Sequence, residues 1–509
     1  MTAPDTRPSQ DAPESPRRRR DRLVSGAVLL ALFGISMILM PPRIPSGNEL
    51  IYLLAPWHNA HPDFLPGDWT FHDWGREHLV FNWVTAGAMR VLPLVAVGWL
   101  GRILGCLVIL AGLLRVGRHL GLTAPAAGAA IALWLVTGQA LVGGEWIIGT
   151  MEAKVAAYGC LVWAVDRLLA DRDRAGGLLL GLTFTLHASV GLQAGAALLG
   201  GLLMLGREPR RIAIVVGWAT LAALPGVFII LPFLRGPGIT EESWRLLVLD
   251  RMPWHLDAVR FGIRPLTGLA LSVGSVLLLA VRRREPGWRF LGGMLAGLSL
   301  VFLGGYAARV AEQWSLLQIF PFRLLPPLAA LGLCFVLVRL CLDFRIRGFP
   351  LVAAAMALGA FLVPGNPLER VGSEWNIRQS RGGQPDDDAG QALQWLAANT
   401  PANALTLTPP ARKDAFLLSQ RAQVVSWDAI PYDRVAEWRD RLECVVGPMV
   451  ATEGERIDGA WFDRAYRARG ADELLACAHR MGAGYIVSPA EYPWPVRYQH
   501  GEWRVYQVP

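Results

Sequence analysis

The chain has 509 residues, of which 53% are hydrophobic and 18% are charged, with a net charge of +8. Soluble domains carry about a quarter charged residues, and the apolar residues here form blocks close to the roughly 20 that cross a bilayer as a helix. A soluble enzyme, a disordered scaffold and a collagen-like chain are therefore excluded, and the composition indicates a polytopic membrane protein with a soluble C-terminal region.

Residues 1–22 are rich in proline, aspartate and arginine, which predicts a disordered cytoplasmic arm. Apolar runs follow, each with the length of a membrane span. No small-residue cleavage site follows the first run, so we interpret it as an uncleaved span and not as a signal peptide. We predict eleven spans, at 23–40, 101–117, 122–141, 153–170, 175–189, 190–206, 211–234, 265–281, 288–306, 321–341 and 348–364.

The loops between these runs define an orientation. If the arm is cytoplasmic, the five loops on the same side are short and rich in arginine, as the positive-inside rule requires. The assignment holds only if 78–98 does not span. This segment contains Asn82 and Arg90 and is broken at Pro93, so we interpret it as an interfacial amphipathic helix in the first outer loop, with a true span as the alternative.

The composition changes after Pro364. Residues 365–388 are polar and predict a linker, and 389–509 alternate between helical and strand patterns, which predicts a small extracytoplasmic α/β domain. We expect helices at 391–398, 434–444, 461–469 and 472–481, and strands at 404–407, 422–427, 484–488, 496–499 and 503–508.

The expected fold class is therefore a membrane all-α protein of about 11 transmembrane helices, over 23–364, with this α/β domain after it. Cys444 and Cys477 are the two cysteines of the C-terminal region, and they could form a disulfide in an oxidising compartment. Both positions are expected to be helical, so the alternative that their side chains face different ways stays open.

The first outer loop is the densest polar region beside the predicted bilayer. It contains Gly47-Asn48-Glu49, then Tyr52, and later the sequence Gly67-Asp68-Trp69. A long outer loop with these features and an interfacial helix resembles the C-type (GT-C) glycosyltransferase superfamily. The resemblance implies an enzyme that takes a sugar from a polyprenyl-phosphate carrier at the outer face of the membrane. The family opens this loop with Asp-Glu, whereas this chain has Asn48-Glu49, which removes the carboxylate usually assigned as the base.

Sugar transfer from a phosphate carrier to a hydroxyl group needs a base for the acceptor proton, and cations or a metal for the leaving phosphate. The candidate catalytic bases in the first loop are Glu49, Asp63 and Asp68. The alternatives are that Glu49 caps a helix, that Asp68 caps a turn and that Asp63 is a solvated surface residue. A divalent metal is the candidate cofactor, and the sequence does not identify its ligands.

Polar residues at the outer ends of other spans are the candidates for substrate binding. Arginine suits phosphate because its guanidinium donates two parallel hydrogen bonds. The alternatives are surface ion pairing and anchoring at the membrane interface. The set comprises Asn48, Tyr52, Glu145, Glu152, Lys154, His187, Arg309 and Arg323, of which Arg323 is the favoured arginine.

We therefore expect an enzyme of the bacterial inner membrane that transfers a sugar from a polyprenyl-phosphate carrier to a glycan, lipid or protein acceptor at the periplasmic face. Its predicted partners include membrane lipid and exclude nucleic acid. The alternatives are a transporter or lipid-handling protein without transferase activity, and a superfamily member that has lost catalysis.

The orientation makes a direct prediction. A reporter enzyme that works only outside the cytoplasm, fused after Pro509, should be active, because the basic loops place the C-terminus in the periplasm. A reporter that works only in the cytoplasm is the matched control and should be inactive. The reverse pattern would mean that 78–98 crosses the membrane.

Overall fold

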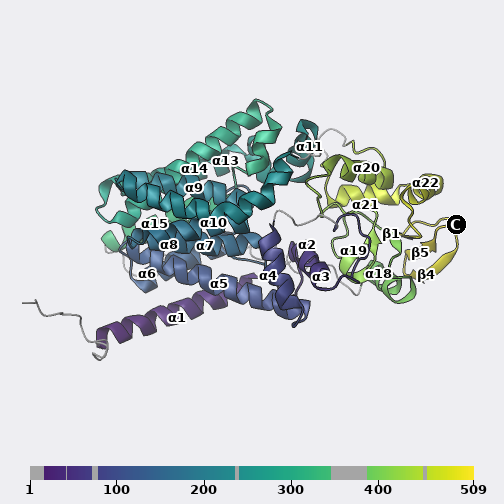
Figure 1. Cartoon of the computed structure of the whole chain (residues 1–509), viewed down its shortest axis with the longest axis horizontal. Helices are drawn as coiled ribbons and strands as arrows, with labels where there is room; N and C mark the ends of the chain where they lie inside the picture. The colour runs from purple at the N-terminus through teal and green to yellow at the C-terminus, as the bar shows by residue number, and fades with distance from the viewer. Residues whose placement is uncertain (1–15, 42, 72–77, 236–239, 345–386, 451–455) are drawn as a thin grey trace, which may run out of the picture.

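The computed structural model describes residues 16–41, 43–71, 78–235, 240–344, 387–450 and 456–509. In Figure 1 the long helices lie side by side in one bundle, and the C-terminal domain covers one end of it. The predicted span 348–364, the linker up to 386 and most of the N-terminal arm lie outside the described residues, so the proposed domain boundaries stay predictions.

The membrane part consists of long helices joined by loops that contain short ones. Its helices are α1 (Pro16–Leu39), α2 (Glu49–Tyr52), α3 (Leu54–Ala60), α4 (Leu79–Met89), α5 (Leu94–His119), α6 (Ala124–Val136), α7 (Ala153–Leu169), α8 (Asp173–Leu186), α9 (Ala188–Met204), α10 (Pro209–Arg235), α11 (Glu241–Leu246), α12 (Pro253–Leu256), α13 (Ile263–Arg282), α14 (Pro286–Val310) and α15 (Leu325–Asp343). We call the end of the bundle that the C-terminal domain covers the outer end, and the loops there the outer loops. A π-helical turn η2 (Leu247–Arg251) and the 3₁₀ turns η3 (Ala258–Phe261) and η4 (Trp314–Ile319) lie in these loops.

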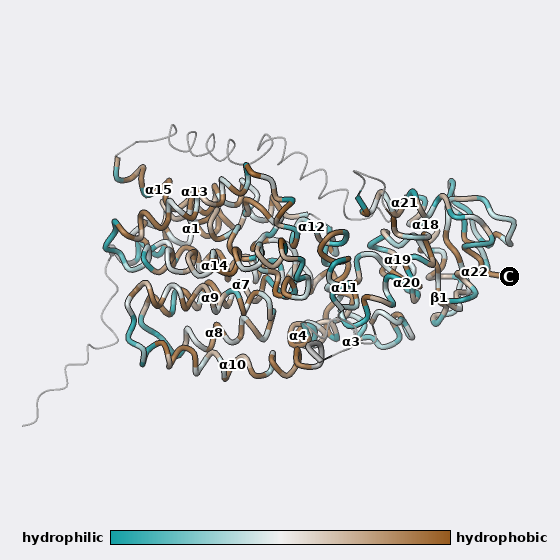
Figure 2. Tube along the Cα trace, turned by 90° about the horizontal axis from the view of Figure 1, so that it is seen from above, coloured by the Kyte–Doolittle hydropathy of each residue, from teal (hydrophilic) through white to brown (hydrophobic). Residues whose placement is uncertain are grey.

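Ten of the predicted apolar runs form helices in the structure. Within the described residues, six helices are long and apolar enough to cross a membrane: α1, α5, α10, α13, α14 and α15. Helices α6 and α8 have 13 and 14 residues, fewer than a straight span needs. The membrane character is confirmed, and the count of eleven spans is not. Figure 2 shows hydrophobic residues along the bundle and hydrophilic residues over the C-terminal domain.

The segment 78–98 is not one helix. Helix α4 ends at Met89 and α5 begins at Leu94, directly after Pro93, whose ring prevents a continuous helix. The 11 residues of α4 reach about 16 Å at 1.5 Å per residue, about half of the hydrocarbon thickness. The break at Pro93 is confirmed, but the following span starts seven residues before the predicted 101.

Glycines bring two of the bundle helices into backbone contact. A Cβ atom added at Gly200 of α9 would lie 2.3 Å from the carbonyl oxygen of Gly293 in α14, and one added at Gly293 would lie 2.2 Å from the Gly200 oxygen. Small residues at such crossings replace side-chain packing with close backbone packing. The glycine-rich sequence of α9 therefore serves helix packing.

The C-terminal domain is a five-stranded mixed sheet with helices around it. The strand order is β2-β1-β3-β5-β4, in which β1 pairs in parallel with β2 and β3, and β5 pairs antiparallel with β3 and β4. The elements are α18 (Asp388–Asn399), β1 (Leu405–Leu407), α19 (Ala415–Ser419), β2 (Ala422–Gln423), α20 (Val435–Val446), α21 (Gly459–Arg467), α22 (Ala471–Met481), β3 (Tyr485–Ser488), β4 (Val496–His500) and β5 (Trp503–Gln507).

Two elements of this domain differ from the prediction. The strand expected over 422–427 ends at Gln423, because the chain leaves the sheet and stacks Trp427 on Trp438, with 5.1 Å between the ring centroids. Helix α19 was not predicted, because its five residues are too few to show a helical period.

The C-terminal domain is fastened to the first outer loop. The backbone N–H of Gln423 donates to Asp68 Oδ2 over 2.9 Å, and Arg434 donates to the Trp69 carbonyl oxygen over 3.2 Å. Phe71 packs edge-on against Phe416, with 5.1 Å between the ring centroids. The loop that resembles the glycosyltransferase motif is therefore also a docking surface for the domain.

A second set of contacts joins the domain to the loop between α10 and α13. Arg251 forms an ion pair of 2.8 Å with Asp428, and Arg439 forms one of 2.9 Å with Glu242. The Trp244 ring stacks on Tyr432, with 6.3 Å between the ring centroids. The loop 428–434 is thus held over the outer end of the bundle.

Cys444 and Cys477 are bonded to each other, with 5.5 Å between their Cα atoms, so the candidate disulfide joins α20 to α22. The other four cysteines are free thiols. A thiol reagent added to denatured, unreduced protein should therefore label four of the six cysteines, and all six after reduction, as counted by mass spectrometry.

Replacing both bonded cysteines by serine should cost the isolated protein roughly 3–4 kcal/mol of stability, because the bond closes a loop of 33 residues. Labelling of six cysteines without reduction would contradict the disulfide.

Candidate active site

A cluster of charged side chains is buried at the outer end of the bundle. Glu145 Oε1 lies 2.8 Å from Lys154 Nζ, and Glu145 Oε2 lies 3.0 Å from Arg323 Nε. Lys154 Nζ also lies 3.4 Å from Glu152 Oε2. The sequence separation between Glu145 and Arg323 is large, but the second outer loop, the start of α7 and the turn before α15 meet here. The structure therefore brings together four of the predicted binding residues.

The start of α9 contacts the guanidinium of the cluster. Arg323 Nη1 donates to Ser189 Oγ over 2.9 Å and lies 3.2 Å from His187 Nε2. The His187 ring packs beside His78, and His78 packs beside Tyr52, with centroid distances of 4.7 and 5.6 Å. His187 and Tyr52, both predicted, thus join the same group, and His78 is an addition to it.

Glu152 is held at the other side of Lys154. It is the N-cap residue of α7, is 2% exposed, and accepts a hydrogen bond of 3.1 Å from Thr150 Oγ1. The Asn48 side chain also hydrogen-bonds Glu152, and burial raises the pKa of the Glu152 carboxyl above its ordinary value. Asn48 therefore enters the cluster from the first loop as a partner of an acid.

The cluster is strongly polarised. Burial on its own would raise the pKa of Glu145, but the charges of Lys154 and Arg323 outweigh it and lower the pKa to about 2. Burial lowers the pKa of His255 to about 4, so this ring is neutral at pH 7. Glu145 is thus a permanent anion that fixes two cations.

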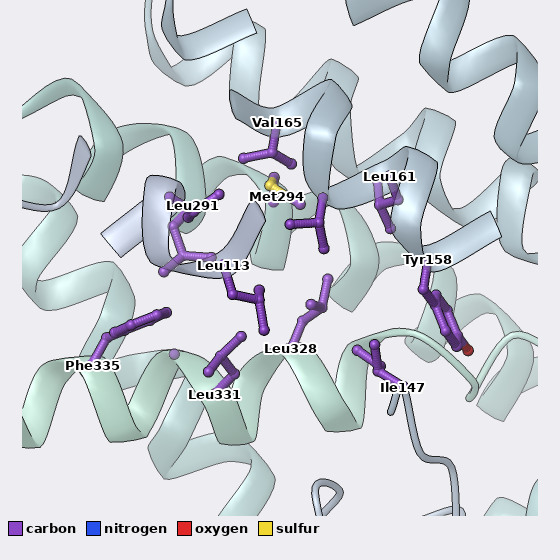
Figure 3. Close-up of a pocket in the computed structure, with 13 residues that line it drawn as sticks. Leu113, Ile147, Tyr158, Leu161, Val165, Leu291, Met294, Leu328, Leu331 and Phe335 are labelled. Atoms are coloured by element: carbon purple, nitrogen blue, oxygen red, sulfur yellow. The ribbon is translucent and has the colours of Figure 1, made fainter. Parts of the chain in front are cut away.

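The floor of the cluster is apolar. The Tyr158 hydroxyl group faces Glu145, and its ring lines an apolar cavity of about 40 Å³ between α5, α7, α14 and α15 (Figure 3). Ile147 from the second loop and Leu328 from α15 line the same cavity. An apolar cavity of this kind stays dry. The charged groups therefore lie next to an apolar region of the bundle.

Glu49 lies apart from these groups, in an ion pair of its own. Both of its oxygens accept hydrogen bonds from Arg102, through Nε at 2.7 Å and through Nη2 at 2.5 Å. The backbone N–H groups of Met151 and Ser46 donate to the same carboxylate, at 2.7 and 3.1 Å. Both side chains are fully buried. The geometry favours a structural role, in which Glu49 joins the first loop to α5 and to the second loop.

Both carboxylate oxygens of Asp68 accept hydrogen bonds from backbone N–H groups. Its Oδ1 accepts from the Thr70 N–H at 2.9 Å and the Phe71 N–H at 3.3 Å, while its Oδ2 holds Gln423 of the C-terminal domain. Burial raises the pKa of Asp68 to about 6. Asp63, by contrast, is exposed to solvent. The first-loop acids therefore have three different environments, and within the described residues no hydrogen bond or ion pair joins any of them to Arg323.

Arg309 belongs to a different group. Its Nε donates to Asp257 Oδ1 over 2.8 Å, and Asp257 also pairs with Arg260 at 3.0 Å. The Arg309 guanidinium lies 4.8 Å from the centroid of the Trp314 ring. This network fastens the loop between α10 and α13 to the end of α14, so Arg309 supports the outer loops and lies outside the cluster around Arg323.

Within the described ranges, no group of three or more His, Cys, Asp or Glu side chains is arranged to hold a metal ion. Glu145 is moreover neutralised by Lys154 and Arg323. The residues of this cluster therefore do not fit a divalent metal.

Sequence reasoning missed several residues that shape the site. Arg102 carried a signal, because a charged residue within an apolar helix needs a partner. No sequence signal identified His78, Ser189 or Gln193, the last of which binds the backbone of the turn before α15, because single polar residues in or near helix ends are common.

The Glu49–Arg102 pair generates a test. Glu49→Gln should lower the stability of the purified protein by about 3–5 kcal/mol, because it leaves a buried arginine without its anion. Asp63→Asn is the matched control in the same loop and should change stability by less than about 0.5 kcal/mol. Thermal unfolding measures both, and equal melting temperatures for the two variants would refute the structural role of Glu49.

Comparisons with known proteins place the fold. A family model described as a domain of unknown function (DUF6798) matches residues 387–445. A search of curated proteins finds no match.

Among solved structures, the chain is similar to the archaeal oligosaccharyltransferase AglB from Archaeoglobus fulgidus, solved in complex with an inhibitory peptide and a dolichol-phosphate. The TM-score is 0.51 at 13% identity, over 92% of this chain and 69% of that one. The chain is also similar to the arabinofuranosyltransferase AftD from Mycobacteria, with a TM-score of 0.48 and 15% identity, over 98% of this chain and 40% of that one. The predicted resemblance is confirmed at the level of the fold, which is that of the C-type glycosyltransferases.

Proposed function

We propose that the protein transfers a sugar from a polyprenyl-phosphate carrier to an acceptor hydroxyl group at the outer, periplasmic face of a bacterial inner membrane. The observation that carries the proposal is the buried cluster of Glu145, Lys154 and Arg323 at the outer ends of α7 and α15. The fold shared with an oligosaccharyltransferase supports the reaction class.

Arg323 has N–H donors that are free to bind a phosphate. A guanidinium has five N–H donors, and the contacts of Arg323 with Glu145, Ser189 and His187 use Nε and Nη1. Its Nη2 has no hydrogen-bond partner among the described residues. Because Glu145 fixes the guanidinium in advance, little side-chain entropy is lost when an anion binds. Arg323, with Lys154 beside it, is therefore the proposed phosphate-binding group.

Glu152 is the proposed general base. Its raised pKa makes it a stronger base than an exposed carboxylate, and Asn48 and Thr150 fix its orientation. In the proposed step the acceptor oxygen attacks the anomeric carbon and the carbon–oxygen bond to the phosphate breaks. The electron pair leaves with the phosphate, and the acceptor proton passes to Glu152. Asn48 thus orients the base in place of the acid that the family carries there. Asp63 in the exposed loop is the second candidate base.

One observation favours lipid handling without transfer as a second function. Glu49 and Asp68, two of the three first-loop acids, are occupied by structural contacts. A protein that bound the carrier and lacked a working base would keep the cationic side of the site. Binding and transfer must therefore be measured separately.

The binding experiment uses undecaprenyl phosphate and the full-length chain in nanodiscs. Arg323→Ala should weaken binding by roughly 10- to 100-fold, the cost of one charge-assisted contact. Arg245→Ala removes an exposed arginine from the same outer face and should leave the affinity unchanged. Equal affinities for the two variants would exclude Arg323 as the phosphate site.

The transfer experiment uses proteoliposomes and a panel of radiolabelled undecaprenyl-phosphate sugars with cell-envelope acceptors. Glu152→Gln should reduce transfer by about 10²–10⁴-fold while undecaprenyl phosphate still binds. Loss of transfer in Asp63→Asn with full activity in Glu152→Gln would assign the base to Asp63 instead. Binding of the carrier with no transfer by the unmodified chain from any donor would favour the lipid-handling function.

A further inference from the structure

The turn that carries Arg323 has an unfavourable backbone conformation. Phe320 has φ of 53° and ψ of 55°, in the left-handed region that few residues other than glycine adopt. The Arg323 N–H donates to the Phe320 carbonyl oxygen over 3.0 Å and closes the turn around Pro321. Conformations of this kind persist only where the surroundings impose them, and they gather at functional sites.

Gln193 of α9 imposes the turn from one side. Its Nε2 donates to the carbonyl oxygens of Ile319 and Phe320, at 3.2 and 2.8 Å, and its Oε1 accepts from the Leu324 N–H at 2.9 Å. Gln193 is 1% exposed. Ser189 lies four residues earlier on the same helix face and binds the Arg323 side chain. One face of α9 thus holds both the backbone of the turn and the guanidinium of its arginine.

Helix α14 imposes the turn from the other side. A Cβ atom added at Gly305 would lie 2.2 Å from Pro321 Cγ and 3.1 Å from the Phe322 ring, so only glycine leaves room for the turn. Phe322 is fully buried and packs edge-on against Phe302, with 4.9 Å between the ring centroids. A Cβ atom added at the neighbouring Gly304 would meet nothing within 4 Å.

The Phe320 side chain gives a reason for a non-glycine residue at this strained position. Its ring centroid lies 4.4 Å from the Arg323 guanidinium carbon, within the range of a cation–π contact. The same ring packs in a T-shaped contact with Trp244, with 6.3 Å between the ring centroids, and Trp244 stacks on Tyr432 of the C-terminal domain. A glycine would make the turn more easily, but it would remove this contact with Arg323.

We propose that the turn 320–323 is a built-in positioning device for the phosphate-binding arginine, with Gln193 and Gly305 as its positioning residues. The inference rests on the proposed function, because it assigns these residues to the same phosphate site. Their task is to keep the guanidinium aimed at the position of the carrier phosphate, not merely to stabilise the bundle.

The test compares Gly305→Ala with its matched neighbour Gly304→Ala in nanodiscs, using undecaprenyl phosphate and the uncharged undecaprenol as probes. Gly305→Ala should weaken the binding of undecaprenyl phosphate by roughly tenfold or more, since tenfold corresponds to one displaced contact of about 1.4 kcal/mol. Its affinity for undecaprenol should not change, because Arg323 does not act on an uncharged head group. Gly304→Ala should bind both probes like the unmodified protein.

The outcomes separate this inference from the proposed function. If Arg323→Ala weakens phosphate binding but Gly305→Ala weakens neither probe or both equally, the positioning role is refuted and the phosphate site stands. If Arg323→Ala has no effect, the proposed function itself fails. Should Gly305→Ala not fold, Pro321→Gly is measured in its place, because it frees the turn without adding bulk. A selective loss of phosphate binding in that variant supports the proposal, and unchanged binding refutes it.

Discussion

The outer end of this protein depends on the ion pairs that the buried carboxylate of Glu145 forms with Lys154 and Arg323. This carboxylate accepts from Lys154 at 2.8 Å and faces Arg323 at 3.0 Å, with its side chain fully removed from solvent. A buried carboxylate is tolerated only when cations and hydrogen bonds compensate for its lost hydration. Loss of any one member leaves an uncompensated charge, so the three groups hold the second outer loop, α7 and the turn before α15 in one arrangement.

Other buried carboxylates at the outer end are also compensated by arginines. Glu49 and Arg102 fix the first loop to α5, and Asp257 fixes Arg309 to the loop between α10 and α13. Asp68 accepts a hydrogen bond from the backbone of Gln423 and so joins the first loop to the C-terminal domain. Charged residues beside a membrane are costly unless paired. In this protein the pairs hold the outer loops together, and in the cluster around Glu145 the Arg323 Nη2 group has no hydrogen-bond partner among the described residues.

The sequence was informative where the physical signal was local. Apolar runs located ten helices, and alternating patterns located most of the C-terminal elements, because both signals are complete within one segment. The first-loop acids, the second-loop group of Glu145, Glu152 and Lys154, and Arg323 were expected to meet, because each stands at the outer end of a different span. The second-loop group and Arg323 do meet, whereas Glu49 and Asp68 are paired elsewhere. The predicted start of the second span, at 101, was too late, because a proline such as Pro93 can either break a helix or stand at the beginning of one. Helix α5 begins at Leu94.

The roles of the acids could not be read from the sequence, because they depend on distant partners. Glu49 meets an arginine 53 residues away, and Asp68 meets a backbone amide 355 residues away. No local pattern distinguishes these acids from exposed Asp63. The three bonds of Gln193 to the turn before α15 were hidden for the same reason, since an isolated glutamine in a helix has no characteristic pattern.

The most direct test of the account is a cryo-EM structure of the full-length chain in nanodiscs with undecaprenyl phosphate. The account predicts density for the phosphate in contact with Arg323 Nη2 and Lys154 Nζ, beside Glu152 and above the apolar floor at Tyr158. A phosphate bound at another part of the outer end, with the cluster around Glu145 unchanged and empty, would contradict it.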